Sequence, residues 1–151
     1  ERILAAVTGY LTEQECEGWS LFGDSTWCLR SFKDKSVIGL SYGIEERDLW
    51  SEKMSNVYKM PTRLYDCFQP PQRSPPLAGT APNATQSCAS VAGHCYETQY
   101  QPYRVCLGPD RTEIKGRQYQ VLRDHLRDRG PLSTHVKIDT EGTEWMVLEQ
   151  L

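Results

Sequence analysis

Hydrophobic and polar residues follow two different periods along this chain, and the changes of period predict its elements. Residues 36–44 form a short apolar run that ends in a glycine turn, which is typical of a buried strand. Residues 48–59 then carry apolar side chains at helical spacing, and Pro61 ends that pattern. Residues 62–68 again have the composition of a strand. The order strand, helix, strand is the first half of a nucleotide-binding α/β unit.

The same alternation returns towards the end of the chain. Residues 102–108 are a third predicted strand, and residues 117–129 have the apolar stripe of a helix, which Gly130-Pro131 ends. Residues 135–138 alternate as a fourth strand. This order predicts an α/β fold, a Rossmann-like parallel sheet with flanking helices. Because a full doubly wound sheet has more strands, we expect the chain to be truncated at its C-terminus.

The remaining segments define the expected domain organisation. Residues 2–15 have the spacing of an amphipathic helix, and residues 16–29 are rich in Gly, Trp and turn-forming residues. We expect an N-terminal helix and an irregular Cys/Trp-rich lead-in over residues 1–35, covering one edge of the sheet. A partial Rossmann-like domain is expected over residues 36–151. A Pro-rich, cysteine-containing loop at residues 69–101 interrupts it.

Composition and charge narrow the possible partners. The chain has 151 residues, 38% hydrophobic and 25% charged, as in an ordinary soluble domain. Its net charge of −3 provides no basic patch, so we expect no nucleic acid partner. It contains no apolar run of the roughly 18 residues that a membrane-spanning helix needs, so an anchor is expected only outside this chain. The sequence does not indicate an oligomeric state.

Cysteine content and a glycosylation sequon indicate the compartment. The chain has six cysteines, and residues 83–85 form an Asn-Ala-Thr sequon in an exposed loop. Together they favour a disulfide-bonded glycoprotein of the secretory pathway, in the Golgi, the ER lumen or outside the cell, over the alternative of a cytoplasmic protein. Sequence cannot choose among the possible pairings. We expect Cys16–Cys28 and Cys88–Cys95 as local loops, which leaves Cys67 and Cys106.

Candidate binding residues stand at the carboxyl ends of the predicted strands, where open α/β sheets bind ligands. The first strand runs into Gly39-Leu-Ser-Tyr-Gly43, whose glycines would let a ligand approach the backbone. Asp66 ends the second strand about twenty residues later, where an acid can accept hydrogen bonds from both ribose hydroxyls. Asp139 and Glu141 follow the last strand.

The last helix is predicted from its capping residues. Thr143 is a suitable N-cap, and Glu144 places a negative charge at the positive end of the helix dipole. Trp145, Leu148 and Leu151 follow at helical spacing and are expected to bury one face. Capping and dipole complementation are also the alternative interpretation of the two acids before this helix.

One motif resembles a known family. Lys137-Ile-Asp-Thr-Glu-Gly-Thr-Glu-Trp145 closely matches the K-I-D-x-E-G-x-E-W signature of the FkbM-like methyltransferases. The turn Ser41-Tyr42-Gly43-Ile44 and the pair Tyr65-Asp66 are similar to the eukaryotic methyltransferase-like branch of that family. The resemblance spans residues 36–151 with a gap over the Pro-rich loop, and only the last motif is distinctive.

The resemblance implies a class I fold that binds S-adenosylmethionine and methylates a hydroxyl of a small molecule or glycan. Along the methionine and ribose part of the cofactor it would place Gly39, Ser41, Tyr42, Gly43 and Ile44. Asp66 would hold the ribose. Asp139 would lie close to the methyl donor, and Glu141 would face the acceptor. Methyl transfer depends on in-line positioning, and a nearby carboxylate can accept the proton of a hydroxyl.

Two other functions remain open at this point. A metal-dependent sugar-nucleotide transferase of the secretory pathway would use Asp139 and Glu141 as ligands of a divalent ion. A non-catalytic interaction domain would keep the fold and the disulfides without the chemistry. A zinc site in the Cys88–Cys95 segment fits no standard spacing, so no metal is expected. His125 and His135 are interpreted as structural.

Overall fold

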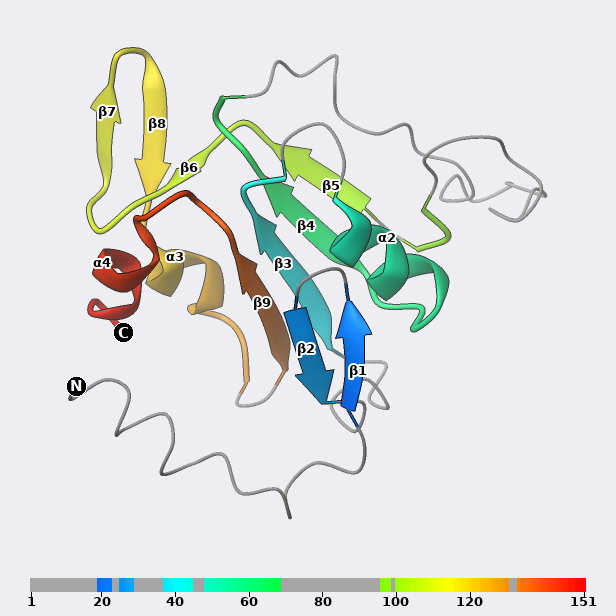
Figure 1. The fold of residues 1–151 in the computed structure, drawn as a ribbon. Helices are drawn as coiled ribbons and strands as arrows, with labels where there is room; N and C mark the ends of the chain where they lie inside the picture. Colours follow the sequence, from blue (N-terminus) through cyan, green and yellow to red (C-terminus); the bar gives the residue numbers. More distant parts are fainter. Residues whose placement is uncertain are drawn as a thin grey trace. The chain divides into compact units, whose positions relative to one another are not determined.

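The computed structural model describes residues 19–22, 25–28, 37–44, 48–68, 96–98, 100–130 and 133–151. The chain divides into two compact units, Glu1–Asp34 and Lys35–Leu151. The described part of the first unit is an antiparallel hairpin of β1 (Trp19–Phe22) and β2 (Ser25–Cys28) (Figure 1).

The hairpin corrects the prediction of an irregular lead-in. Ser20 pairs with Trp27 and Leu21 with Thr26, in a regular register. Aromatic and β-branched residues favour strands, and the surrounding glycines and turn formers hid this preference in the sequence. The helix expected over residues 2–15 lies outside the described residues.

The second unit is built on a parallel sheet with the strand order β5-β4-β3-β9 (Figure 1). Its strands are β3 (Ile38–Tyr42), β4 (Thr62–Tyr65), β5 (Tyr100–Tyr103) and β9 (Thr134–Ile138). The helices are α2 (Leu49–Asn56), α3 (Leu122–Leu126) and α4 (Glu144–Leu148). The expected α/β architecture, a four-stranded parallel sheet with flanking helices, is therefore present.

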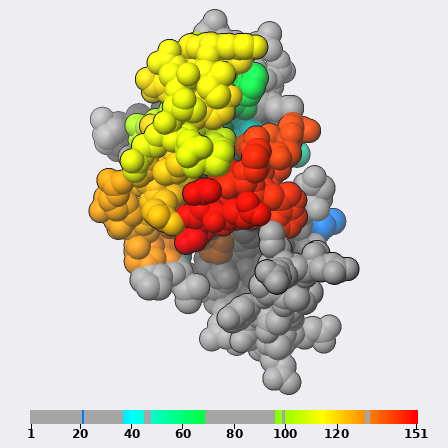
Figure 2. Space-filling view, turned by 90° about the vertical axis from the view of Figure 1, so that its left-hand side faces the viewer, coloured from blue at the N-terminus to red at the C-terminus, as the bar shows by residue number. Residues whose placement is uncertain are grey.

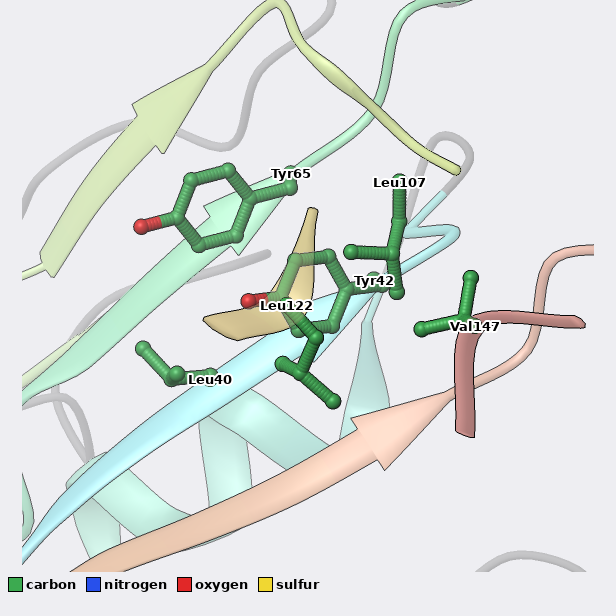
Figure 3. Close-up of a cluster of buried hydrophobic side chains, with 6 residues drawn as sticks. All are labelled: Leu40, Tyr42, Tyr65, Leu107, Leu122 and Val147. Atoms are coloured by element: carbon green, nitrogen blue, oxygen red, sulfur yellow. The ribbon is translucent and has the colours of Figure 1, made fainter. Parts of the chain in front are cut away.

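The central strand β3 is covered on both faces. On one face, Leu40 and Tyr42 belong to a buried cluster that includes Leu122 of α3 and Val147 of α4 (Figure 3). On the other face, Gly39 lies against Trp50 of α2. Burial on both faces explains why this strand is a continuous apolar run in the sequence.

A second, three-stranded sheet has the order β6-β8-β7 and was not predicted. Its strands are β6 (Cys106–Leu107), β7 (Thr112–Ile114) and β8 (Arg117–Gln120). The helix expected over residues 117–129 is therefore wrong over residues 117–121, and α3 covers only Leu122–Leu126 of that range. Lys115 and Gly116 have φ of 52° and 73°, and two positive φ angles make a tight turn that imposes a hairpin. The strand expected over residues 102–108 is divided between β5 and β6.

A disulfide bond joins Cys67, just after β4, to Cys106 of β6, with a Cα–Cα distance of 4.8 Å. These are the two cysteines that the expected local pairs left over. The bonds expected for Cys16–Cys28 and Cys88–Cys95 lie outside the described residues, as does the sequon. The disulfide is consistent with an extracellular or secretory location. Among the described residues, no helix is long and apolar enough to cross a membrane.

Helix α4 buries a different side chain from those expected. Trp145, Leu148 and Leu151 are 56%, 43% and 59% exposed, whereas Val147 is 1% exposed and joins the core (Figure 3). The helix follows a tight turn directly, and this turn fixes which position faces the sheet. In Figure 2 the red atoms of α4 lie at the surface, beside the yellow-green and yellow atoms of residues 100–120.

Candidate functional site

A cavity of about 630 Å³ lies at the carboxyl ends of β3, β4 and β9. Its volume is within the range of small-molecule sites, roughly 300–1,000 Å³. The chain leaves β3 for β4 on one side of the sheet and later returns to β9 on the other side. Ligands of open α/β sheets bind at such a change of direction.

Most of the residues singled out in the sequence line this cavity. These residues come from the ends of three strands and are Tyr42, Gly43, Ile44, Asp66, Asp139 and Glu141. Gly39 and Ser41 do not line it. Successive strand residues face opposite sides of a sheet, so these two lie deeper in β3 on the face that α2 covers. A Cβ at Gly39 would come within 3.0 Å of Trp50 and 3.1 Å of Thr62.

Gly43 fixes the contact between the ends of β3 and β9. It has a φ of +73°, and a Cβ there would overlap the carbonyl oxygen of Asp139. The Gly43 amide donates to the Tyr65 carbonyl at 3.0 Å, and the Asp139 amide donates to the Tyr42 carbonyl at 3.1 Å. The glycine is therefore needed for the approach of two backbone segments, and not only for that of a ligand.

Lys137 is a cavity residue that the sequence analysis did not select. Its Nζ donates to the Gly43 carbonyl at 2.9 Å and lies 3.7 Å from Oδ2 of Asp139. Its side chain is 18% exposed, against 60% for Asp139. In the sequence, only its place in the terminal motif could have indicated a role. It puts one positive charge among the acids of the described lining.

The Asp66 carboxylate is held by its own turn. Its Oδ1 accepts the backbone amide of Phe68 at 2.7 Å, and its amide donates to the Tyr103 carbonyl at 3.1 Å. Such a bond to the residue two positions on is an Asx-turn, which orients the side chain. The neighbouring disulfide attaches Cys67 to β6. The acid therefore has a fixed place at the cavity wall.

Glu144 organises the acidic turn. Its Oε1 accepts the Thr140 amide at 2.7 Å and its Oε2 accepts the Gly142 amide at 3.0 Å. Hydrogen bonds from its own backbone amide and from those two lower the pKa of Glu144. Within residues 133–151 the turn amides bond this carboxylate and neither Asp139 nor Glu141, and the N-cap residue Thr143 makes no side-chain capping bond. The interpretation of the two cavity acids as caps is therefore not supported by the contacts of this segment.

An aromatic floor supports the cavity from the side of α3. The ring centroids of Tyr42 and Tyr65 are 4.8 Å apart and nearly parallel, and His125 stacks on Tyr65 at 4.5 Å. Burial raises the pKa of Tyr42 well above its usual range and lowers the pKa of His125. Both groups are therefore neutral near pH 7. His125 thus belongs to the packing beneath the site, a position that its helical spacing did not indicate.

Within the described ranges, no group of three His, Cys, Asp or Glu side chains is placed to hold a metal ion. No known family, curated protein or solved structure matches this chain. Its function is therefore argued from the chemistry of the site.

Proposed function

We propose that this chain is the methyltransferase domain of an FkbM-like, S-adenosylmethionine-dependent enzyme with a class I Rossmann-like fold. The observation that supports it best is the meeting of three sequence-distant segments in one cavity. These are residues 42–44, Asp66 and residues 139–141, the segments that the resemblance assigns to the cofactor and the acceptor.

The chemistry of the lining suits the parts of this cofactor. The Asp66 carboxylate matches the two ribose hydroxyls, and apolar Val105 and Leu107 match the adenine base. Lys137 can neutralise the cofactor carboxylate, while Asp139 can face its positive sulfonium centre. Both charges of the ligand thus have a partner of opposite sign.

The protein then contributes positioning and proton removal. When bound, the cofactor supplies an electrophilic methyl group on a positively charged sulfur. Glu141, on the turn beyond β9, would accept the proton of the acceptor hydroxyl; the oxygen of that hydroxyl would take the methyl group while the carbon–sulfur bond breaks and leaves a neutral thioether. Asp139 stabilises the positive charge beside it, and Lys137 keeps the ends of β3 and β9 together.

The acceptor is proposed to be a hydroxyl of a small molecule or glycan in the secretory pathway. The Cys67–Cys106 bond, whose two cysteines line the cavity, supports an oxidising compartment, because disulfides persist there. Thr140 and Thr143 add neutral hydroxyls to the lining near the acids. Such a surface suits a polar, uncharged acceptor.

Isothermal titration calorimetry with S-adenosylmethionine and with S-adenosylhomocysteine tests the proposal. We expect both to bind the wild type, and Asp66→Asn to weaken binding by about 10- to 100-fold, as loss of charged hydrogen bonds does. Asparagine retains the oxygen that accepts from Phe68, so the turn should persist. Asp110→Asn, an exposed acid away from the cavity, is the matched control and should not change the affinity. Absence of binding heat in the wild type would refute the function.

A further inference from the structure

The floor of the cavity is joined to a histidine on another element. His125 of α3 stacks on Tyr65 at 4.5 Å and 16°, and on Tyr42 at 5.6 Å and 8°. Tyr65 in turn stacks on Tyr103 at 4.9 Å. Rings from α3, β3, β4 and β5 therefore form one continuous block.

The orientation of the Gln120 amide assigns a tautomer to this histidine. Nε2 lies 2.6 Å from Oε1 of Gln120, an oxygen that can only accept, so Nε2 carries the proton. Nδ1 lies 2.5 Å from the Tyr42 hydroxyl and therefore accepts its proton. Tyr42 is 1% exposed, so water cannot replace His125 as the acceptor.

The backbones of Tyr42 and Tyr65 bond residues that line the cavity. The Tyr42 carbonyl accepts the Asp139 amide at 3.1 Å, and the Tyr65 carbonyl accepts the Gly43 amide at 3.0 Å. Tyr65 is followed directly by Asp66. A change in the position of these stacked rings would therefore shift the cavity residues at the ends of β3, β4 and β9.

We propose that His125 is a positioning residue of this cavity: neutral His125 holds Tyr42 and the strand ends in the binding arrangement, and its protonation weakens ligand binding. The identity of the ligand used below rests on the proposed function. A protonated Nδ1 donates to the Tyr42 oxygen, so this hydrogen bond reverses and the buried hydroxyl proton of Tyr42 loses its only described acceptor.

The charged groups around His125 set the direction of the pH effect. Burial is the main cause that lowers its pKa from 6.5; Asp124 on the same helix raises the pKa, and Arg63 of β4 lowers it. Asp124 is itself bound to Arg111 and Arg127. Tyr42 and Tyr65 are neutral here. The ligand affinity is therefore highest near pH 7, where His125 is neutral, and it falls as the pH falls through the lowered pKa of His125.

Titration calorimetry with S-adenosylhomocysteine between pH 5 and 8 tests this linkage. The wild-type affinity should fall by up to about tenfold per pH unit below the pKa of His125. Tyr42→Phe keeps the ring stack and removes the hydroxyl, so it should bind more weakly at pH 7.5 and lose the pH dependence. His135→Gln, a change at the histidine of β9, should keep the wild-type profile. A wild-type affinity that does not vary over this range, or a Tyr42→Phe profile like the wild type, would overturn the proposal.

Nuclear magnetic resonance without ligand separates this inference from the methyltransferase proposal. The His125 ring should show the Nε2–H tautomer, and the amide signals of Gly43 and Asp139 should shift with its titration midpoint. If these shifts occur while S-adenosylhomocysteine fails to bind, the methyltransferase proposal fails and the positioning role stands. Amide signals that do not follow His125 would overturn the positioning role whatever the ligand.

Discussion

At the scale of single residues, two glycines show how one backbone angle can have two different causes. Gly43 and Gly116 both have a φ of +73°. At Gly43 a Cβ would overlap the Asp139 carbonyl, whereas a Cβ at Gly116 would meet nothing within 4 Å. Gly116 serves turn conformation alone, while Gly43 also makes room for the end of β9.

Alanine substitution should separate the two causes. Gly116→Ala should lower the free energy of unfolding by about 1–2 kcal/mol, the cost of a left-handed alanine. Gly43→Ala should lower it by more than about 3 kcal/mol, because the backbone contact with Asp139 must open as well. Urea denaturation of both variants measures the difference. Equal losses would show that the β3–β9 contact does not depend on this glycine.

At the scale of elements, predictions succeeded where one face or both faces of an element are buried. The apolar run of β3 and the alternating β9 were found because the core imposes their pattern. The β7–β8 hairpin was missed because all three residues of β7 are exposed and follow no apolar pattern. Tyr119 and Leu122 also share the spacing of a helix face, yet the turn at Lys115 and Gly116 decides for a hairpin. In α4, spacing identified an apolar face but not the residue that meets the sheet.

The Cys67–Cys106 disulfide is a covalent cross-link between the segment that follows β4 and strand β6 of the three-stranded sheet. It closes a sequence separation of 39 residues, for which the chain-entropy model gives about 4 kcal/mol of stabilisation. The double variant Cys67→Ser/Cys106→Ser should lose about that amount in oxidising buffer, measured by urea denaturation. A loss below about 1 kcal/mol would mean that the β6-β8-β7 sheet is held in place without the bond.

At the scale of the whole molecule, the cavity depends on which strand ends become neighbours. The sequence indicated which polar residues follow the strands. Because the carboxyl ends of parallel strands lie at one edge of a sheet, these residues were expected to lie close together. It could not show that Gly39 and Ser41 lie below the ligand face, or that Lys137 bonds the Gly43 carbonyl. Those details follow from the register of β3 with β9, which is a long-range property.

Buried tyrosines should make the whole fold sensitive to alkaline pH. Burial raises the pKa values of Tyr42 and Tyr65, and raises the pKa of Tyr100 to about 12, against 10.0 in an unfolded chain. Above pH 10 the unfolded chain loses phenol protons that the folded chain keeps, so stability falls as the pH rises. Phenolate absorbance of these tyrosines should therefore appear together with the loss of circular dichroism. Full phenolate absorbance from a folded protein would contradict this expectation. Tyr100→Phe should reduce the sensitivity.

The hydrogen bond between Lys137 and the Gly43 carbonyl joins residues 94 positions apart. Parallel strands so distant in sequence pair slowly, because a long loop must close before any contact forms. The unit β3–α2–β4 can form from residues close in sequence. The cavity forms only after β9 has paired with β3. We therefore expect the cavity to form late in folding. A ligand that binds only this cavity therefore stabilises the folded state and does not accelerate the earlier steps of folding.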